Sequence, residues 1–233
     1  MLPDVLLQIG SFSLNTLGAF FALAFLVGLF LFWRWGRQEG FSSDDLLDLS
    51  LVGSLVGLAG GRIAFLIISG GFGNILDILK IGDGIFWFGA LGFGFLSIVL
   101  FAWIKKWSFL KIGSIGAPAL AFGQAVGFLG AEILDYIPFG FYPALGYLSL
   151  GFFLGFLRKR TSSGISLFSY LFISGGLIYL AEWLRPDKAV FFGVNINYVS
   201  AAAISVLGLV GILAVLIAKK RPFGVKRNGN GKK

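Results

Sequence analysis

The 233-residue sequence contains no cysteine and no histidine, and only 13% of its residues are charged. These absences exclude disulfide bonds, metal sites built from thiolate or imidazole groups, a cysteine nucleophile and a histidine general base. A metal ion would find only scattered carboxylates, so no metal or other cofactor is expected. Carboxylate, amide, hydroxyl, guanidinium and ammonium groups are left to carry any polar chemistry.

Hydrophobic residues, in contrast, make up 57% of the chain, and 27 residues are phenylalanine. The mean hydropathy of +0.90 is far above that of an ordinary soluble domain. Composition therefore predicts an integral membrane protein. The net charge of +8 does not indicate nucleic-acid binding, because the cations stand in short runs between apolar segments and in the tail.

Seven apolar segments approach the ~20 residues that a helix needs to cross ~30 Å of hydrocarbon. They cover residues 14–33, 46–69, 84–104, 110–134, 141–157, 165–184 and 197–218. The predicted fold is an all-α integral membrane protein with about seven transmembrane helices, in one polytopic domain over residues 1–218. Ser43 is the predicted N-cap of the second helix. Residues 219–233 are predicted to form a basic, disordered tail.

The loops differ in their content of lysine and arginine. If the N-terminus lies outside, the inner loops and the tail hold fifteen of these residues, and the outer loops hold only Lys80, Arg185 and Lys188. The positive-inside rule then places the N-terminus outside and the C-terminus in the cytoplasm. Residues 1–13 have no basic n-region, so no cleaved signal peptide is expected.

A small set of polar side chains falls inside the apolar segments. Arg62 lies within the second segment, Glu132 and Glu182 lie near the outer ends of the fourth and sixth, and Gln124 lies two turns deeper than Glu132. A charge in hydrocarbon requires a counter-charge, water or a lipid phosphate, so Arg62 is the leading functional candidate. All four residues fall in the outer half of the membrane, and the inner half has no comparable set. They predict a polar chamber between helices 2, 3, 4 and 6 that opens toward the outer leaflet.

Structural explanations of the same residues stay open. An ion pair between Arg62 and Glu132 or Glu182 would hold two helices together without binding a ligand. Either glutamate, taken singly, lies close enough to the interface to reach water. Glycines in the apolar segments are expected to form close helix contacts rather than a phosphate site: Gly53, Gly57, Gly60, Gly123, Gly127, Gly151 and Gly155.

Several motifs follow one another along almost the whole chain. They are Ile9-Gly10-Ser11-Phe12, Gly60-Gly61-Arg62, Phe88-Gly89-Ala90-Leu91-Gly92, Ala117-Pro118-Ala119-Leu120-Ala121-Phe122-Gly123 and Ala181-Glu182-Trp183-Leu184-Arg185-Pro186-Asp187. In this order and spacing they resemble the prolipoprotein diacylglyceryl transferase family. The resemblance implies a multi-pass protein of the bacterial cytoplasmic (inner) membrane with its N-terminus outside.

The resemblance also implies an activity. Such a transferase moves the diacylglyceryl group of phosphatidylglycerol, or a similar outer-leaflet phospholipid, to the cysteine thiol of a lipoprotein precursor and releases glycerol phosphate. Arg62 and Glu182 match the family's arginine and glutamate, so both are expected to be catalytic, with Arg62 as the phosphate-binding cation and Glu182 as its partner. Gln124, Glu132 and Gly89 are expected to line the lipid site.

The chain departs from the family pattern at several polar positions. Three phenylalanines stand where the family pattern has a polar residue: Phe88 in place of a histidine, Phe21 in place of a tyrosine and Phe128 in place of an arginine. Ala131 stands in place of an asparagine, and Ile178 in place of a second arginine. The outer arm between the fourth and fifth helices is reduced to residues 135–140. A catalytically inactive relative that binds lipid or lipoprotein, or acts as a membrane scaffold, therefore stays open as the alternative. A transporter would fit the glycine-rich helices, but the sequence shows no inverted repeat.

Overall fold

The computed structural model describes residues 5–9, 12–69, 74–79, 84–134, 140–184, 190–191 and 194–220. The seven α-helices in these ranges are α1 (Thr16–Gln38), α2 (Ser43–Ile68), α3 (Trp87–Ile104), α4 (Phe109–Ile133), α5 (Phe141–Arg160), α6 (Ile165–Leu184) and α7 (Ile196–Lys220). Shorter elements are the strands β1 (Val5–Ile9), β2 (Phe12–Asn15), β3 (Val190–Phe191) and β4 (Val194–Asn195), and the 3₁₀-helix η1 (Ile75–Leu79).

The seven helices confirm the predicted fold class, an all-α integral membrane protein. Helices α1, α2, α4, α6 and α7 are long and apolar enough to cross a membrane. The other two are marginal: α3 is apolar over the shorter range Gly89–Ile104, and α5 has 20 residues but ends in three basic ones. Large apolar side chains cover the outer surfaces of the helices, as hydrocarbon requires; Phe152, for example, is 67% exposed.

Two expected boundaries were wrong. The N-cap of α2 is Ser42, whose backbone is extended, and not Ser43. The Ser43 hydroxyl instead accepts a hydrogen bond from the indole nitrogen of Trp33 at 2.6 Å, which fixes the α1–α2 turn. At the C-terminus, α7 continues through Lys220, so the first two residues of the expected tail are helical. Cations are favourable at a helix C-terminus because they face its unsatisfied carbonyl groups. Residues 221–233 lie outside the described part.

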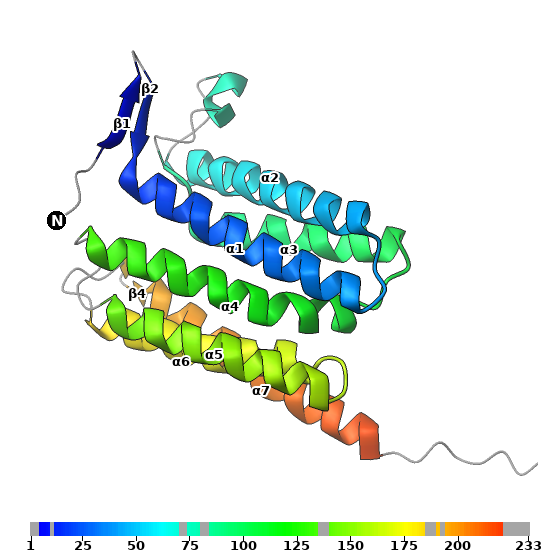
Figure 1. Ribbon diagram of the computed structural model, residues 1–233. Helices are drawn as coiled ribbons and strands as arrows, with labels where there is room; N and C mark the ends of the chain where they lie inside the picture. Colours follow the sequence, from blue (N-terminus) through cyan, green and yellow to red (C-terminus); the bar gives the residue numbers. More distant parts are fainter. Residues whose placement is uncertain are drawn as a thin grey trace, which may run out of the picture.

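Helix α4 is the centre of the bundle and packs against α1, α5 and α6. Helices α2 and α3 form a close pair on one side of it, and α6 pairs with α7 on the other (Figure 1). Glycines allow this close packing: a Cβ on Gly57 would lie 3.2 Å from the Ala90 carbonyl oxygen of α3. A Cβ on Gly123 would lie 2.9 Å from the Ala24 carbonyl oxygen of α1. Gly155 is an exception among the expected helix contacts, because no atom lies within 4 Å of its Cβ position.

The two small sheets and η1 lie at one end of the bundle (Figure 1). In the first sheet β1 pairs with β2, and in the second β3 pairs with β4, both antiparallel. These strands were not predicted from the sequence, because they have only two to five residues each and so carry little periodic signal. This is the end that the positive-inside rule predicts to be outside. Glu182 belongs to the last turn of α6, and Arg62 lies six residues before the end of α2 on the same side.

Candidate functional site

Arg62 connects α2 to the loop that follows it. Its side chain is buried, with 2% of the residue exposed. The Nε–H donates to the carbonyl oxygen of Asp77 in η1 at 2.9 Å, and Nη1 donates to the carbonyl oxygen of Gly84 at 3.0 Å. The guanidinium carbon also lies 5.3 Å from the centre of the Phe65 ring. The arginine therefore fixes both η1 and the segment leading into α3 against the end of α2.

Glycines beside Arg62 allow this arrangement. The Gly61 carbonyl oxygen accepts the backbone N–H of Phe86 at 3.0 Å, which joins α2 directly to the start of α3. Gly84 has φ +134°, a backbone conformation that residues other than glycine rarely adopt. In this conformation its carbonyl oxygen accepts a hydrogen bond from Arg62. Gly89, expected to line the lipid site, lies in the α2–α3 contact, since a Cβ there would be 2.9 Å from the Gly60 carbonyl oxygen.

Glu182 is equally buried, with 2% of the residue exposed. One carboxylate oxygen accepts a hydrogen bond from the Asn195 amide and the other from the Asn197 amide, both at 2.7 Å. The Asn195 carbonyl oxygen Oδ1 in turn accepts the backbone N–H groups of Asn197 and Tyr198, so this residue caps α7. Neither asparagine was predicted as a site residue, although an asparagine just before an apolar run is a helix-start signal.

The other two predicted site residues have local partners. Gln124 Oε1 accepts a hydrogen bond from the Tyr170 hydroxyl of α6 at 2.8 Å, which joins α4 to α6. The Glu132 carboxylate accepts the backbone N–H of Gly140 at 2.5 Å and so connects the end of α4 to the start of α5. Each of these residues therefore has a visible structural role.

The described hydrogen bonds give each of the four predicted polar residues a partner outside that set. Helix α2 packs against α1, α3 and η1, whereas α6 packs against α4, α5 and α7. The pairing of Arg62 with Glu182 that the resemblance implies does not appear among the contacts of the described residues. The structure thus holds a buried cation and a buried carboxylate at the same end of the bundle, on two separate helix pairs.

Two of the departures from the family pattern are visible in the structure. Phe128 stacks on Tyr147, with ring centres 5.4 Å apart and planes 12° from parallel. Both rings belong to the apolar cluster between α4, α5 and α6. Phe21 is 57% exposed on α1, facing the surrounding hydrocarbon. Phe128 therefore packs inside the bundle and Phe21 adds to its exposed apolar surface, at two positions where the resemblance implies polar groups.

We expect Glu182→Ala to lower the free energy of unfolding by about 3 kcal/mol, because it leaves two partly buried amide groups without their charged acceptor. Thermal or denaturant unfolding of the purified protein in detergent measures this loss. Glu132→Ala is the matched control: it also removes an outer carboxylate, but only one hydrogen bond, and should cost about 1 kcal/mol. Equal losses in the two variants would contradict the role of Glu182 in holding Asn195 and Asn197 at the start of α7.

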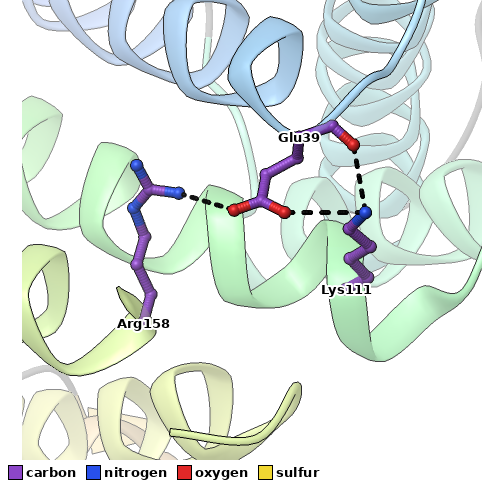
Figure 2. A network of polar contacts seen from close by, with 3 residues as sticks. All are labelled: Glu39, Lys111 and Arg158. Carbon is purple, nitrogen blue, oxygen red and sulfur yellow. Dashed lines mark hydrogen bonds and ion pairs between the residues drawn. The ribbon is translucent and has the colours of Figure 1, made fainter. Parts of the chain in front are cut away.

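The structure also assembles a charged group that the sequence analysis did not find. At the opposite end of the bundle, the Glu39 carboxylate lies between Lys111 of α4 and Arg158 of α5 (Figure 2). The three residues are far apart in the chain, and each stands near the end of a different helix. Only the packing of α4 against α1 and α5 brings them together.

Comparison with known proteins gives a consistent result. A family model described as prolipoprotein diacylglyceryl transferase matches residues 4–217. A Clostridium tetani protein named phosphatidylglycerol–prolipoprotein diacylglyceryl transferase is 26% identical over 80% of this chain and 86% of its own length. Proteins of the same name are 28% identical in Listeria innocua, covering 95% of this chain and 92% of the relative, and 25% identical in Streptococcus agalactiae, covering 91% and 96%. The chain therefore belongs to the prolipoprotein diacylglyceryl transferase family.

Proposed function

We propose that this protein is a diacylglyceryl transferase of the bacterial cytoplasmic membrane that uses phosphatidylglycerol and a lipoprotein precursor. The observation that carries the proposal is the extent of the family match, over residues 4–217 of the 233-residue chain. The similar proteins named for this activity match over most of their own length as well.

In the proposed reaction, the thiol sulfur of the precursor attacks the carbon of the diacylglyceryl group that is bonded to the phosphate oxygen. A carbon–sulfur bond forms, the carbon–oxygen bond to phosphate breaks, and glycerol phosphate leaves with the electron pair. The proton of the thiol ends on the released phosphate monoester, so charge is conserved. A fixed cation near the phosphate stabilises the charge that develops on the leaving oxygen.

Arg62 is the residue that we assign to this task. It is buried near the predicted outer end of α2, where an outer-leaflet headgroup would lie, and the carbonyl groups of Asp77 and Gly84 hold its guanidinium group in place. Preorganisation of this kind is what electrostatic catalysis requires. Glu182 is assigned the second catalytic position, and Gln124, Glu132 and Gly89 the lining of the lipid site.

A second function has specific support. Arg62 fixes η1 and the α3 entry, and Glu182 holds both asparagines at the start of α7, so each buried charge has a structural role. Phe128 also fills the bundle with an aromatic stack at a position that is polar in the family pattern. These features favour a non-catalytic relative that keeps the fold and binds lipid or lipoprotein.

Complementation distinguishes the two functions. The chain is expressed in cells depleted of their own diacylglyceryl transferase, and a reporter lipoprotein is weighed by mass spectrometry. We expect growth and a mass increase equal to one diacylglyceryl group on the reporter. Membrane insertion is verified in parallel, with an ordinary family member as the positive control. Correct insertion without the mass increase would refute the transferase and leave the binding function.

A further inference from the structure

A small cavity opens at the end of the bundle that is predicted to face the cytoplasm. It has a volume of about 60 Å³ and is lined by Glu39, Lys111, Arg158 and the serines Ser114, Ser162 and Ser163. That volume is enough for roughly four water molecules at ~15 Å³ each, or for one group of similar size. The lining therefore offers two cations, one carboxylate and three hydroxyl groups around a space that fits a small polar ligand.

Arg158 is the most deeply placed of these charges. Its side chain is only 5% exposed, and its guanidinium carbon lies 4.9 Å from the centre of the Trp35 ring. Its Nε–H is buried and has no hydrogen-bond partner among the described residues. A buried donor without an acceptor costs free energy, so the Nε–H is a donor that an anion in the adjoining polar cavity can satisfy.

The Glu39 backbone carbonyl oxygen accepts a hydrogen bond from Lys111 Nζ at 3.0 Å, but the Glu39 carboxylate holds the two cations only loosely (Figure 2). Its carboxylate oxygens lie 3.5 Å from Lys111 Nζ and 3.5 Å from Arg158 Nη1 (Figure 2). Charge-assisted hydrogen bonds between such groups are usually ~2.7–2.9 Å long, so neither contact is optimal. The Glu39 side chain is also 41% exposed and neutralises only one of the two positive charges. An anion can therefore enter beside it or take its place.

The serine side of the cavity adds to its preference for anions. Ser162 and Ser163 lie three and two residues before the start of α6, whose N-terminus carries partial positive charge. Ser114 is held by the backbone N–H of Gly164, which donates to its hydroxyl oxygen at 2.7 Å, and this contact fixes the α5–α6 turn against α4. The three serines thus line the same cavity as the two cations.

We propose that this cavity binds a phosphate group, with Arg158 and Lys111 as its cationic ligands and Glu39 as a built-in competitor that occupies the place of the anion. A guanidinium group matches the geometry of phosphate oxygens, and hydroxyl groups complete the set of donors. The site is at the opposite end of the bundle from Arg62 and is independent of the transferase activity. The phosphate belongs either to the headgroup of an inner-leaflet phospholipid or to a soluble phosphate ester.

The test compares three variants of the full chain, purified into phosphatidylcholine nanodiscs. Glu39→Gln removes the competitor and should tighten phosphate binding by roughly ten-fold, since one like charge beside the anion is lost. Arg158→Lys keeps the charge but loses the Nε–H, and should weaken binding by roughly ten-fold or more. Asp45→Asn is the matched control, because it removes a carboxylate paired with Lys105 at 2.6 Å near the same end of the bundle.

Two arms identify the source of the phosphate. In the first, inorganic phosphate and glycerol phosphate are titrated at constant ionic strength while thermal stability is measured. In the second, phosphatidylglycerol is added to the nanodiscs, and the lipids retained per protein are counted by native mass spectrometry. The proposal is supported if binding of phosphate or lipid, in either arm, is strongest in Glu39→Gln, weaker in Asp45→Asn and weakest in Arg158→Lys. The arm that gives this order identifies the source of the phosphate.

The opposite result is equally clear. If Glu39→Gln binds no more phosphate or lipid than Asp45→Asn in both arms, the three charged residues form only a structural ion network, and the proposal is wrong. Because Glu39→Gln is a surface change that keeps size and shape, this outcome does not depend on whether Arg158→Lys folds.

Discussion

Arg62→Ala is expected to abolish diacylglyceryl transfer and to destabilise the outer loop. The substitution removes the buried cation proposed to stabilise the leaving phosphate, which should lower the rate by at least roughly a hundred-fold. It also leaves the carbonyl groups of Asp77 and Gly84 without their charged donor, at a cost of about 3 kcal/mol. Reporter lipidation measures the first effect, and thermal unfolding of the purified protein measures the second.

A second pair of variants separates the catalytic from the structural role of Arg62. Arg62→Lys retains a positive charge, so part of the activity should remain. The lysine cannot reproduce the two divergent N–H donors of arginine, so the activity should be lower than that of the unchanged protein. Gly84→Ala keeps the arginine but strains the backbone at φ +134° and crowds the Phe65 ring 2.7 Å away. Full transfer by Arg62→Ala would rule out a catalytic role. Equal loss in Gly84→Ala and Arg62→Ala, at equal stability, would assign the effect to the loop alone.

Gly208→Ala is expected to destabilise the protein more than any other glycine-to-alanine substitution in the α6–α7 pair. A Cβ at this position would lie 2.7 Å from the Phe168 carbonyl oxygen and still closer to the Phe172 backbone nitrogen. Backbone atoms cannot rotate away, so the two helices must separate and lose packing. We expect a loss of about 3 kcal/mol in the free energy of unfolding, after a gain of ~1 kcal/mol from the higher helix propensity of alanine.

Gly176 provides the matched control for this prediction. It lies in the middle of α6, and no atom is found within 4 Å of its Cβ position. Gly176→Ala should therefore be neutral or stabilise the protein by up to ~1 kcal/mol. Unfolding of both variants in the same detergent gives the comparison. Similar stabilities would show that the α6–α7 contact is looser than the structure indicates.

The class of the protein and the positions of its helices could be predicted from the sequence. Residues 165–184 were predicted as a membrane segment, and α6 is Ile165–Leu184. This success has a local cause, because a transmembrane helix satisfies its own backbone hydrogen bonds and needs only a sufficient length of apolar side chains. The helix ends were predicted less accurately, since they depend on single residues: Ser42 is the N-cap of α2, and the Ser43 hydroxyl is used by Trp33 instead.

The candidate sites were predicted less completely. Arg62 and Glu182 were recognised because buried charges are rare, but the sequence did not show that Asn195 and Asn197 hold the glutamate. The inner site was missed altogether, since neither Glu39 nor Arg158 is unusual at the end of its own helix. A charge at a helix end near the cytoplasm is the normal pattern, so no local feature distinguished them.

By itself the sequence determined a polytopic, all-helical membrane protein without thiol or imidazole chemistry, because composition and hydropathy are properties of the chain alone. Only the tertiary structure decided which groups meet. It joined Arg62 to the carbonyl groups of η1 and the α3 entry, Glu182 to two asparagines, and Glu39 to Lys111 and Arg158. Such contacts depend on how the helices pack, which in a membrane is set by small residues and shape rather than by hydrophobicity.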